Sequence, residues 1–449
     1  MRNEQKKSKY LDFGLLLLFF ALILAWSLTA GKVGGPDEPM RYNVAKYLYE
    51  HPGHLPHGAE ESIRSDTWGL SYAFYPILSY MVSAVFMWIA GIFSTDELVL
   101  LHAARLADVL FVTVAAWYVI QIGKRLFGEE KGRFYAILVM FLPGFAFMGT
   151  YVNTDSLALM AAAMILYAWV KYLDEGWTWK NCILLAVGMA ICFLSYFNAY
   201  GWILWSFFFF CITILCYSDR PFRERFQFLM SRGVTIAGVT FSLAGWWFIR
   251  NYILYDGDFL GRKASTLCAE IYAEEAFKPS KHLTPSNMGW NLKQFFLYQD
   301  PGWPHNWVIM VLVTFVGTFG HLKYYMNETA SKVYIIFIGI GVLCMVFALS
   351  KFRLSTSKGL FHLMMFLAMI TPVILFINYA FCNDNQAQGR YIMSAIYPLM
   401  YFVTLGYDKA LQRFIKKEEI RRWFFRIVGA LWILGAILVY ALVIIPSYT

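Results

Sequence analysis

The chain has 449 residues, of which 59% are hydrophobic and only 15% are charged, and its formal net charge is +9. Soluble domains carry about 25% charged residues, so the composition excludes a soluble protein and predicts a polytopic membrane protein. The positive charge is poor evidence for nucleic-acid binding, because most of the excess lies in short loops between apolar segments. We expect one integral-membrane domain over residues 1–449.

Apolar segments long enough to be considered as membrane spans recur along the whole chain. In chain order they are 11–30, 71–93, 99–120, 134–151, 156–171, 181–197, 201–217, 233–249, 305–320, 333–350, 360–380, 390–406 and 424–446. The first of them could be a signal peptide, but no small-residue cleavage site follows it. We therefore interpret it as a retained anchor.

The distribution of Lys and Arg indicates which of these segments cross the membrane. The basic loops are the N-terminus, 123–133, 218–232, 350–358 and 408–423. All of them fall on the cytoplasmic side if two segments, 71–93 and 305–320, stay at the outer surface as interfacial or re-entrant helices. This predicts an all-α protein with about 11 spans, and about 13 at most, and with a cytoplasmic N-terminus.

Two long outer loops follow from this topology, at about 31–98 and at about 250–332. The first contains "GGPDEPMR", in which Asp37 and Glu38 lie between two prolines directly after the first apolar segment. Prolines on both sides exclude a regular helix through the pair and restrict its backbone. We expect two rigidly held carboxylates near the outer headgroup plane, and a solvated turn is the alternative.

A second polar cluster, "YVNTDS", shares the outer face with this pair and contains Asn153 and Asp155. Asp is a strong N-cap residue, so Asp155 could simply cap the apolar segment that follows it. That structural role and a role in a site are compatible.

A third cluster, "NDNQAQGRY", brings Gln388, Arg390 and Tyr391 to the start of a span. A guanidinium at headgroup depth can grip a lipid phosphate with two donors, and snorkelling to the interface is the alternative. Arg250 has the same position relative to its own span. Arg41 and Arg105 are weaker candidates of the same kind.

Histidines and cysteines give little support for a metal centre. His51, His54 and His57 are spaced by three residues, but prolines and a glycine interrupt any helix there, so we expect a polar loop. The seven cysteines form no CxxC pair. Free thiols are expected, although Cys268 and Cys382 both fall in polar stretches and could meet in a disulfide.

These parts favour one kind of reaction. Nucleotide sugars are absent outside most cells, so an activated donor at an outer site must arrive through the lipid, as a polyprenyl-phosphate sugar does. Its phosphate is a good leaving group once a cation or a metal stabilises it, and one carboxylate then suffices as the base for the acceptor hydroxyl. A glycoside hydrolase needs a second carboxylate as acid, so the pattern favours transfer.

Six segments also resemble a known family. They are "PDEPMRY", "RLADVLFVTVAAWYVIQIGKRLFG", "LPGFAFMGTYVNTDSLAL", "GWWFIRNYILYDGDFLG", "FVGTFGHL" and "QGRYIMSAIYP". Together they cover most of the chain in family order and resemble the GT-C superfamily of polytopic glycosyltransferases, which includes protein O-mannosyltransferases and aminoarabinose transferases of lipid A. Within it, the chain is most similar to the bacterial DUF2142 group.

The resemblance implies a GT-C fold and a role for each cluster. Asp37 matches the catalytic base, with Glu38 beside it, and Asn153 and Asp155 would help to build the site. Arg390 and Arg250 would contact the donor phosphate. Members of the superfamily differ in their use of metal, so a divalent cation, Mg or Mn, near Asp37 and Asp155 is left open.

We therefore expect an inverting glycosyltransferase of the cell membrane that works on its extracytoplasmic face. It would move a sugar from a polyprenyl-phosphate donor to an envelope glycan, a glycolipid or a protein. The alternative from another class is a transporter or flippase of lipid-linked sugars. Such proteins place ionisable residues and broken helices near the bilayer midplane, where most of these segments carry no charge. A non-catalytic assembly partner is the third hypothesis.

Overall fold

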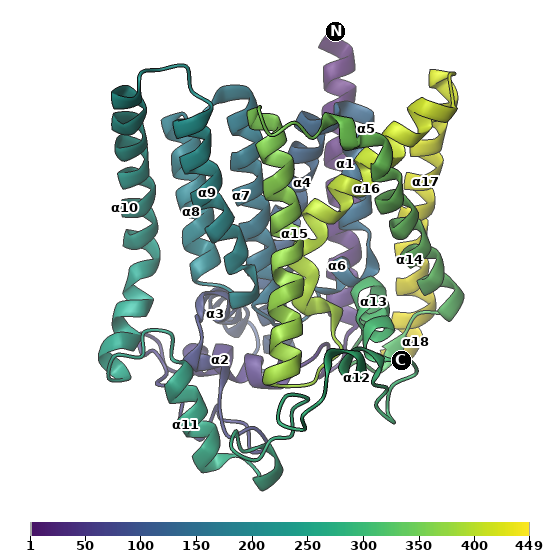
Figure 1. Cartoon of the computed structure of the whole chain (residues 1–449). Coiled ribbons are helices and arrows are strands. Elements are labelled where there is room, and N and C mark those ends of the chain that lie inside the picture. The colour runs from purple at the N-terminus through teal and green to yellow at the C-terminus, as the bar shows by residue number, and fades with distance from the viewer. Residues whose placement is uncertain (1, 449) are drawn as a thin grey trace.

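The computed structural model describes residues 2–448, and most of them are helical. The long helices run side by side along one direction, with the two chain termini at opposite ends of the bundle (Figure 1). Among the described residues, helices long and apolar enough to cross a membrane are Ser8–Thr29, Glu97–Phe127, Asp155–Glu175, Phe197–Cys216, Phe222–Leu254, Glu328–Leu349, Ser357–Cys382 and Glu418–Tyr448. The prediction of an all-α, multi-pass membrane protein is confirmed.

The first part of the chain holds ten α-helices. They are α1 (Arg2–Thr29), α2 (Glu38–Glu50), α3 (Leu78–Gly91), α4 (Glu97–Phe127), α5 (Glu129–Met140), α6 (Pro143–Phe147), α7 (Asp155–Glu175), α8 (Trp179–Phe193), α9 (Tyr200–Cys216) and α10 (Phe222–Leu254).

The second part completes the bundle. Its α-helices are α11 (Arg262–Tyr272), α12 (Leu292–Leu297), α13 (Trp307–Gly317), α14 (Glu328–Leu343), α15 (Ser357–Cys382), α16 (Ile396–Phe414), α17 (Glu418–Val439) and α18 (Ile445–Tyr448). The shorter helical turns are η1 (Tyr72–Phe74), η2 (Phe197–Ala199), η3 (Glu275–Phe277), η4 (Cys344–Lys351), η5 (Gly389–Ala395) and the π-turn η6 (Tyr440–Ile444). Strands β1 (Thr318–Phe319) and β2 (Tyr324–Tyr325) form an antiparallel hairpin.

Helices α2, α3, α11 and α12 gather at one end of the bundle, which we call the loop end (Figure 1). Helix α3 has 14 residues and α13 has 11. At 1.5 Å per residue, neither covers a hydrocarbon core of about 30 Å. Their shortness supports the prediction that segments 71–93 and 305–320 do not cross, whereas the number of spans stays a prediction.

One predicted span is broken. The apolar segment 134–151 was expected as a single helix, but α5 ends at Met140 and a new short helix, α6, begins at Pro143. Proline lacks an N–H and fits the first turn of a helix rather than its interior. The residues after α6 form hydrogen-bonded turns up to α7. This irregular stretch positions Asn153 and Asp155.

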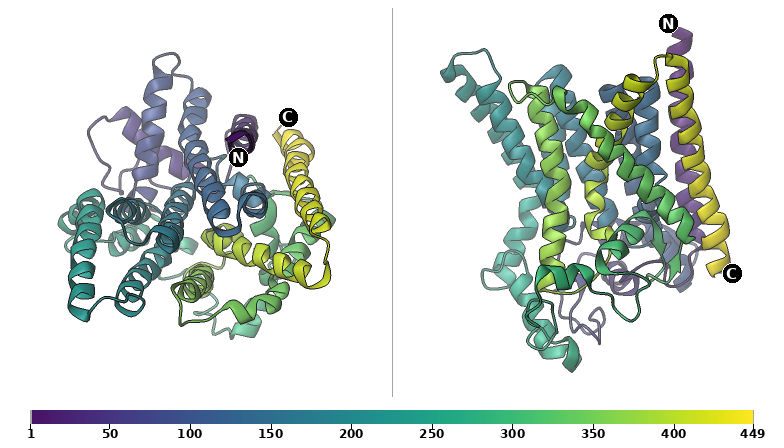
Figure 2. Two further views of the ribbon diagram at one scale, coloured as in Figure 1. Left: turned by 90° about the horizontal axis from the view of Figure 1, so that it is seen from above. Right: turned by 45° about the vertical axis from the view of Figure 1, so that its right-hand side comes forward.

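Close backbone contact and terminal packing hold the bundle together. Gly123 of α4 faces Gly132 of α5, where an added Cβ would lie 2.3 Å from the Gly132 carbonyl oxygen. Small residues allow such approach between membrane helices. The N-terminal and the C-terminal helices lie on the same side of the bundle (Figure 2), and the end of α1 contacts η6, where the Thr29 and Tyr440 hydroxyls lie 2.8 Å apart. All seven cysteines are free, so the disulfide alternative is not realised.

Candidate active site

The "GGPDEPMR" stretch forms a sharp entry into α2. Asp37 is the N-cap residue of α2 and has a left-handed backbone with φ 61°, a conformation that Asp and Asn tolerate better than most residues. The expectation that the prolines exclude a helix through the acid pair is wrong at its second residue. Glu38 is already helical, because the proline that follows it lies in the first turn, where no N–H is needed.

Two glycines let this entry pack against the bundle. A Cβ on Gly34 would come within 2.8 Å of the Arg105 side chain, and one on Gly35 within 2.3 Å of the Tyr151 ring. Contacts that close require shifts of both partners, so only glycine fits here. The C-terminal Tyr448 also donates hydrogen bonds to the carbonyl oxygens of Val33 and Gly34, both 3.3 Å long. Asp37 is therefore held by packing from several helices.

Asp37 meets two buried arginines from distant parts of the chain. Arg390 Nη2 lies 2.6 Å from Asp37 Oδ2, and Arg41 Nη2 lies 4.0 Å from the same oxygen. Arg41 Nη1 is 3.5 Å from Asp155 Oδ2, and the Arg41 guanidinium covers the Tyr72 ring at 4.5 Å. Burial alone would raise the pKa of Asp37, but Arg390 and Arg41 lower it to about 2. Two arginines and two carboxylates thus form one alternating cluster.

Asn153 and Asp155 have different places in this arrangement. Asp155 is the first residue of α7 and Thr154 is its N-cap, so Asp155 does not cap the helix. The Asn153 side chain caps the helix instead, because its Oδ1 accepts a hydrogen bond from the Ser156 N–H at 2.8 Å. Its Nδ2 donates to the carbonyl oxygens of Met148 (2.8 Å) and Tyr151 (2.6 Å). Asn153 therefore shapes the turn that presents Asp155 to Arg41.

Glu38 is not brought to the same place as Asp37. Its side chain is 1% exposed and receives Arg105 Nε on Oε1 and Arg105 Nη2 on Oε2, both at 2.7 Å. The backbone N–H groups of Val152 and Gly34 also donate to it. Arg105 further donates to carbonyl oxygens at the end of α1. Both residues are saturated with internal partners and turned away from any opening.

A cavity of about 350 Å³ lies beside Asp37 at the loop end. Its walls come from α2, the first long loop, the α8–η2 connection, α15 and the segment after α15. The lining residues are Asp37, Met40, Trp68, Leu70, Tyr72, Tyr75, Pro76, Tyr80, Thr154, Ser195, Tyr196, Phe197, Asn198, Arg262, Leu375, Asn378, Tyr379, Asn383, Asp384, Gln386 and Tyr391. A much smaller pocket adjoins it, and Asp155, Arg390 and Tyr391 are among the residues around that one.

The remaining predicted residues are divided between the cavity and the scaffold. Tyr391 lines the cavity, and its ring lies 5.0 Å from the Arg390 guanidinium. Gln388 is buried and donates to Gln386 Oε1 at 2.7 Å, outside the lining. Arg250 is also outside it, because it donates to the Pro56 carbonyl oxygen and to Asn251 Oδ1. The structure therefore does not bring Arg250 to Asp37.

Several residues of the site were not singled out from the sequence. Asp108 of α4 is 1% exposed and accepts hydrogen bonds from the Asn153 N–H (3.3 Å) and from Ser156 Oγ. An ionisable residue inside an apolar segment is a signal that could have found it. Asp384 belongs to the third polar cluster, "NDNQAQGRY", in which attention went to Arg390 and its neighbours. No local pattern marks Tyr72 or Asn198, because only tertiary contacts bring them to the cavity.

A metal ion does not fit between Asp37 and Asp155 in this arrangement. The space between the two carboxylates is taken by the Arg41 guanidinium, and Arg390 occupies the other side of Asp37. Within residues 2–448, no group of three or more His, Cys, Asp and Glu side chains could hold a metal ion. The divalent cation near Asp37 and Asp155 that the sequence left open is therefore not supported by the residues around it.

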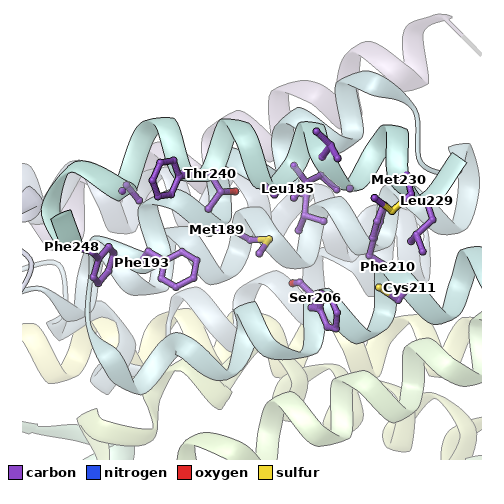
Figure 3. A pocket seen from close by; sticks show the side chains of 18 residues that line it. Leu185, Met189, Phe193, Ser206, Phe210, Cys211, Leu229, Met230, Thr240 and Phe248 are labelled. Atoms are coloured by element: carbon purple, nitrogen blue, oxygen red, sulfur yellow. The ribbon is translucent and has the colours of Figure 1, made fainter. Parts of the chain in front are cut away.

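An apolar groove of about 700 Å³ runs along α8, α9 and α10 (Figure 3). The side chains that Figure 3 labels in it include Leu185, Met189, Phe193, Phe210 and Phe248. Phe193 ends α8, and Ser195, two residues further on, already lines the cavity. The groove therefore begins next to the polar cavity and continues between apolar helices.

Comparison with protein families gives one match. The model of the family described as dolichyl-phosphate-mannose-protein mannosyltransferase matches residues 79–247, from α3 into α10. The comparison with curated proteins finds no match.

Solved structures match over almost the whole chain. The apo oligosaccharyltransferase of Archaeoglobus fulgidus is 13% identical with a TM-score of 0.53, and the match covers 98% of this chain and 55% of that one. Its complex with zinc and sulfate is 14% identical with a TM-score of 0.53 and coverages of 93% and 52%. ArnT of Cupriavidus metallidurans bound to undecaprenyl phosphate is 14% identical with a TM-score of 0.52 and coverages of 97% and 74%.

The chain thus spans 55% of the oligosaccharyltransferase and 74% of ArnT. At this level of identity the matches show the fold alone, and they confirm the predicted GT-C fold. The matched family model, over residues 79–247, is described as a mannosyltransferase and is consistent with the class of enzyme that the sequence predicts. The finer resemblance to the DUF2142 group stays a prediction.

Proposed function

We propose that this protein is an extracytoplasmic glycosyltransferase that moves one sugar from a polyprenyl-phosphate donor to a hydroxyl acceptor, with Asp37 as the base. The observation that carries the proposal is the position of Asp37. Its carboxylate is a quarter exposed and lines the 350 Å³ cavity, while Arg390 and Arg41 lie directly behind it. A base and a guanidinium group that can bind a phosphate, that of Arg390 at the small adjoining pocket, are thereby adjacent.

The transfer step balances with these residues alone. The acceptor hydroxyl gives its proton to the Asp37 carboxylate as its oxygen attacks the anomeric carbon of the donor sugar. The bond from that carbon to the phosphate oxygen breaks, and the phosphate keeps the electron pair. Arg390 stabilises the charge on the phosphate through charge-assisted hydrogen bonds, and the buried Arg41 adds its positive charge behind Asp37. Attack from the face opposite the phosphate inverts the anomeric centre.

Arg390 also couples donor binding to the strength of the base. Arg390 is 2.6 Å from Asp37 and contributes to its low pKa of about 2, which makes Asp37 a weak base. A donor phosphate that engages Arg390 draws positive charge away from Asp37, so the pKa of Asp37 rises. Proton abstraction is thereby favoured only once the donor is bound.

The groove along α8, α9 and α10 supports a lipid-linked donor. A polyprenyl chain in this apolar channel would leave its phosphate at the Phe193 end, beside the cavity. Similar GT-C proteins are consistent with such a ligand, since the ArnT structure contains undecaprenyl phosphate. We extend this ligand class, polyprenyl phosphate, to the present chain.

The charge at the opposite end of the bundle supports an outward-facing cavity. Helix α4 runs from the loop end to a basic turn, where Lys124 and Arg133 pair with Asp12 at 2.5 and 2.7 Å (Figure 1). Short basic loops remain in the cytoplasm. We therefore place the N-terminus inside the cell and the loop end outside.

Substitution of the base tests the proposal. Asp37→Asn should lower the transfer rate by about 10²–10⁴-fold, the usual contribution of a general base. The variant should remain folded, because Asn tolerates the left-handed backbone and can still accept from Arg390. The measurement is sugar transfer by purified protein from a panel of polyprenyl-phosphate sugars.

Asp256→Asn is the matched control. Asp256 also has a left-handed backbone, with φ 48°, but it is exposed and outside the cavity. It should transfer at the rate of the wild type. If Asp37→Asn also keeps that rate, Asp37 is not the base.

A further inference from the structure

One wall of the cavity consists of the end of α15 and the segment after it, residues 375–386. We propose that this wall is the subsite for the donor sugar, that it selects one uncharged, hydroxyl-rich monosaccharide, and that Asp384 determines this specificity. The inference rests on the proposed function and names its substrate class.

Asp384 is held rigidly yet keeps free acceptor capacity. Its side chain is 18% exposed, Gln386 Nε2 donates to its Oδ2, and His282 Nε2 lies 3.5 Å from its Oδ1. A carboxylate offers about four acceptor positions, so roughly two remain open toward the cavity. Burial raises the pKa of Asp384 and the charge of Asp37 adds to this, although Gln386 and His282 oppose it. A desolvated carboxylate of this kind gains from new hydroxyl donors.

Gln386 fixes the direction of Asp384 relative to the catalytic cluster. Its Oε1 accepts from the Tyr391 hydroxyl and from Gln388 Nε2, both at 2.7 Å. The Tyr391 ring in turn covers the Arg390 guanidinium. A chain of contacts therefore runs from the phosphate-binding arginine to the carboxylate that we assign to the sugar.

The lining combines aromatic and polar side chains of the kinds that bind a sugar ring. Tyr72, Tyr75, Tyr196 and Tyr379 line the cavity with aromatic surface, against which the C–H face of a sugar can pack. Asn198 Nδ2 donates to the Tyr391 carbonyl oxygen at 3.3 Å. Its Oδ1 has no hydrogen bond within residues 2–448 and can accept from a hydroxyl. Aromatic walls with a few convergent polar groups are typical of small-ligand sites.

Charge and volume limit which sugar fits. An acidic sugar would face Asp384 and Asp37, and like charges repel. An amino sugar would face the positive charge of Arg262 in the cavity lining and of Arg390 beside Asp37, which repels an ammonium group. The cavity of about 350 Å³ lies at the lower end of the usual range of about 300–1,000 Å³ for small-ligand sites. It accommodates one sugar with its phosphate rather than a chain of sugars.

The test compares polyprenyl-phosphate donors that carry a neutral hexose, its monodeoxy analogues, an amino sugar and a uronic acid. Wild-type protein should transfer the neutral hexose with the highest kcat/KM. A site that binds a hydroxyl through a buried polar group rejects the analogue lacking it. One deoxy analogue should therefore react at least tenfold more slowly with the wild type. Asp384→Ala should lose that discrimination and still transfer sugar.

Asp66→Asn is the control, because Asp66 is an exposed carboxylate of the first long loop outside the cavity lining. It should keep the preference of the wild type. If Asp384→Ala does not fold, judged by thermal unfolding in detergent, Asn378→Ala on the exposed part of the same wall replaces it and should shift the same preference.

The outcomes separate the two proposals. Absence of transfer from every donor by the wild type overturns the proposed function and this inference with it. Transfer that is fastest with the amino sugar or the uronic acid overturns only the inference. So does an unchanged deoxy discrimination in the variant.

Discussion

Two adjacent carboxylates occupy opposite kinds of environment in this protein. Glu38 is sealed in an ion pair with Arg105 whose partners are 1% and 0% exposed. Asp37 is 25% exposed, lines a cavity, and pairs with Arg390 and Arg41 on its other side. The left-handed backbone of Asp37, followed directly by the helical Glu38, sends the two side chains in different directions.

The extent of burial, rather than the residue type, separates the carboxylate that stabilises the fold from the carboxylate that can reach a substrate. Glu38 and Arg105 together bind the end of α1, the start of α2, α4 and the turn after α6. Nothing in that pair is open to a substrate. Asp37 has an open face, and its partner Arg390 also borders a pocket, so its contacts can be exchanged when a ligand arrives.

The largest effect is expected when the buried ion pair between Glu38 and Arg105 is disrupted. Glu38→Gln leaves the buried Arg105 without a counterion, and loss of one partner of a buried pair costs about 3–5 kcal/mol. We expect the free energy of unfolding in detergent to fall by that amount, with Asp37→Asn losing less. Equal losses in the two variants would show that the two carboxylates do not differ as the structure indicates.

An intermediate effect is expected when the ion pair between Arg390 and Asp37 is altered. Arg390→Lys keeps the charge but loses the planar fork that grips a phosphate with two donors. We expect KM for a polyprenyl-phosphate sugar to rise about tenfold, equivalent to about 1.4 kcal/mol, with a small change in stability. Arg105→Lys is the control and should show the reverse, a clear loss of stability with KM unchanged in the folded fraction.

The smallest effect is expected in the pH dependence of stability, to which Asp37 contributes through its lowered pKa. The pKa of Asp37 is lowered from 3.8 to about 2 in the folded protein. Its ion pair therefore stabilises the fold above pH 3.8, and this stabilisation is lost as the pH falls toward 2. About 1 kcal/mol should disappear between pH 6 and pH 3. The difference in unfolding free energy between wild type and Asp37→Asn, measured in detergent at both pH values, should shrink accordingly.

Much of the fold follows from local sequence properties. Hydrophobic segments long enough to span a bilayer, and the basic loops between them, predict a helical bundle with the short segments α3 and α13 at one surface. The break at Pro143 could have been predicted as well, because proline does not fit a helix interior. It was missed because the surrounding residues are uniformly apolar.

The candidate site is only partly accessible from sequence. Asp37, Asp155 and Arg390 stand out as polar residues at the edges of apolar segments, and the structure brings them together. Arg250 has the same local setting, yet its side chain is bonded to the first long loop. The setting of an arginine next to a span is local, whereas the partner it meets depends on how the loops pack.

Hydropathy and loop charge act over single segments, so they are enough to predict a membrane protein of many helices. The sequence also indicates where acids and arginines could meet the headgroup region. That Asp37 lines the cavity and Glu38 does not is a result of tertiary contacts. Their partners lie 353 and 67 positions away, at Arg390 and Arg105. Side-chain direction at a helix start depends on such distant contacts, which no local pattern contains.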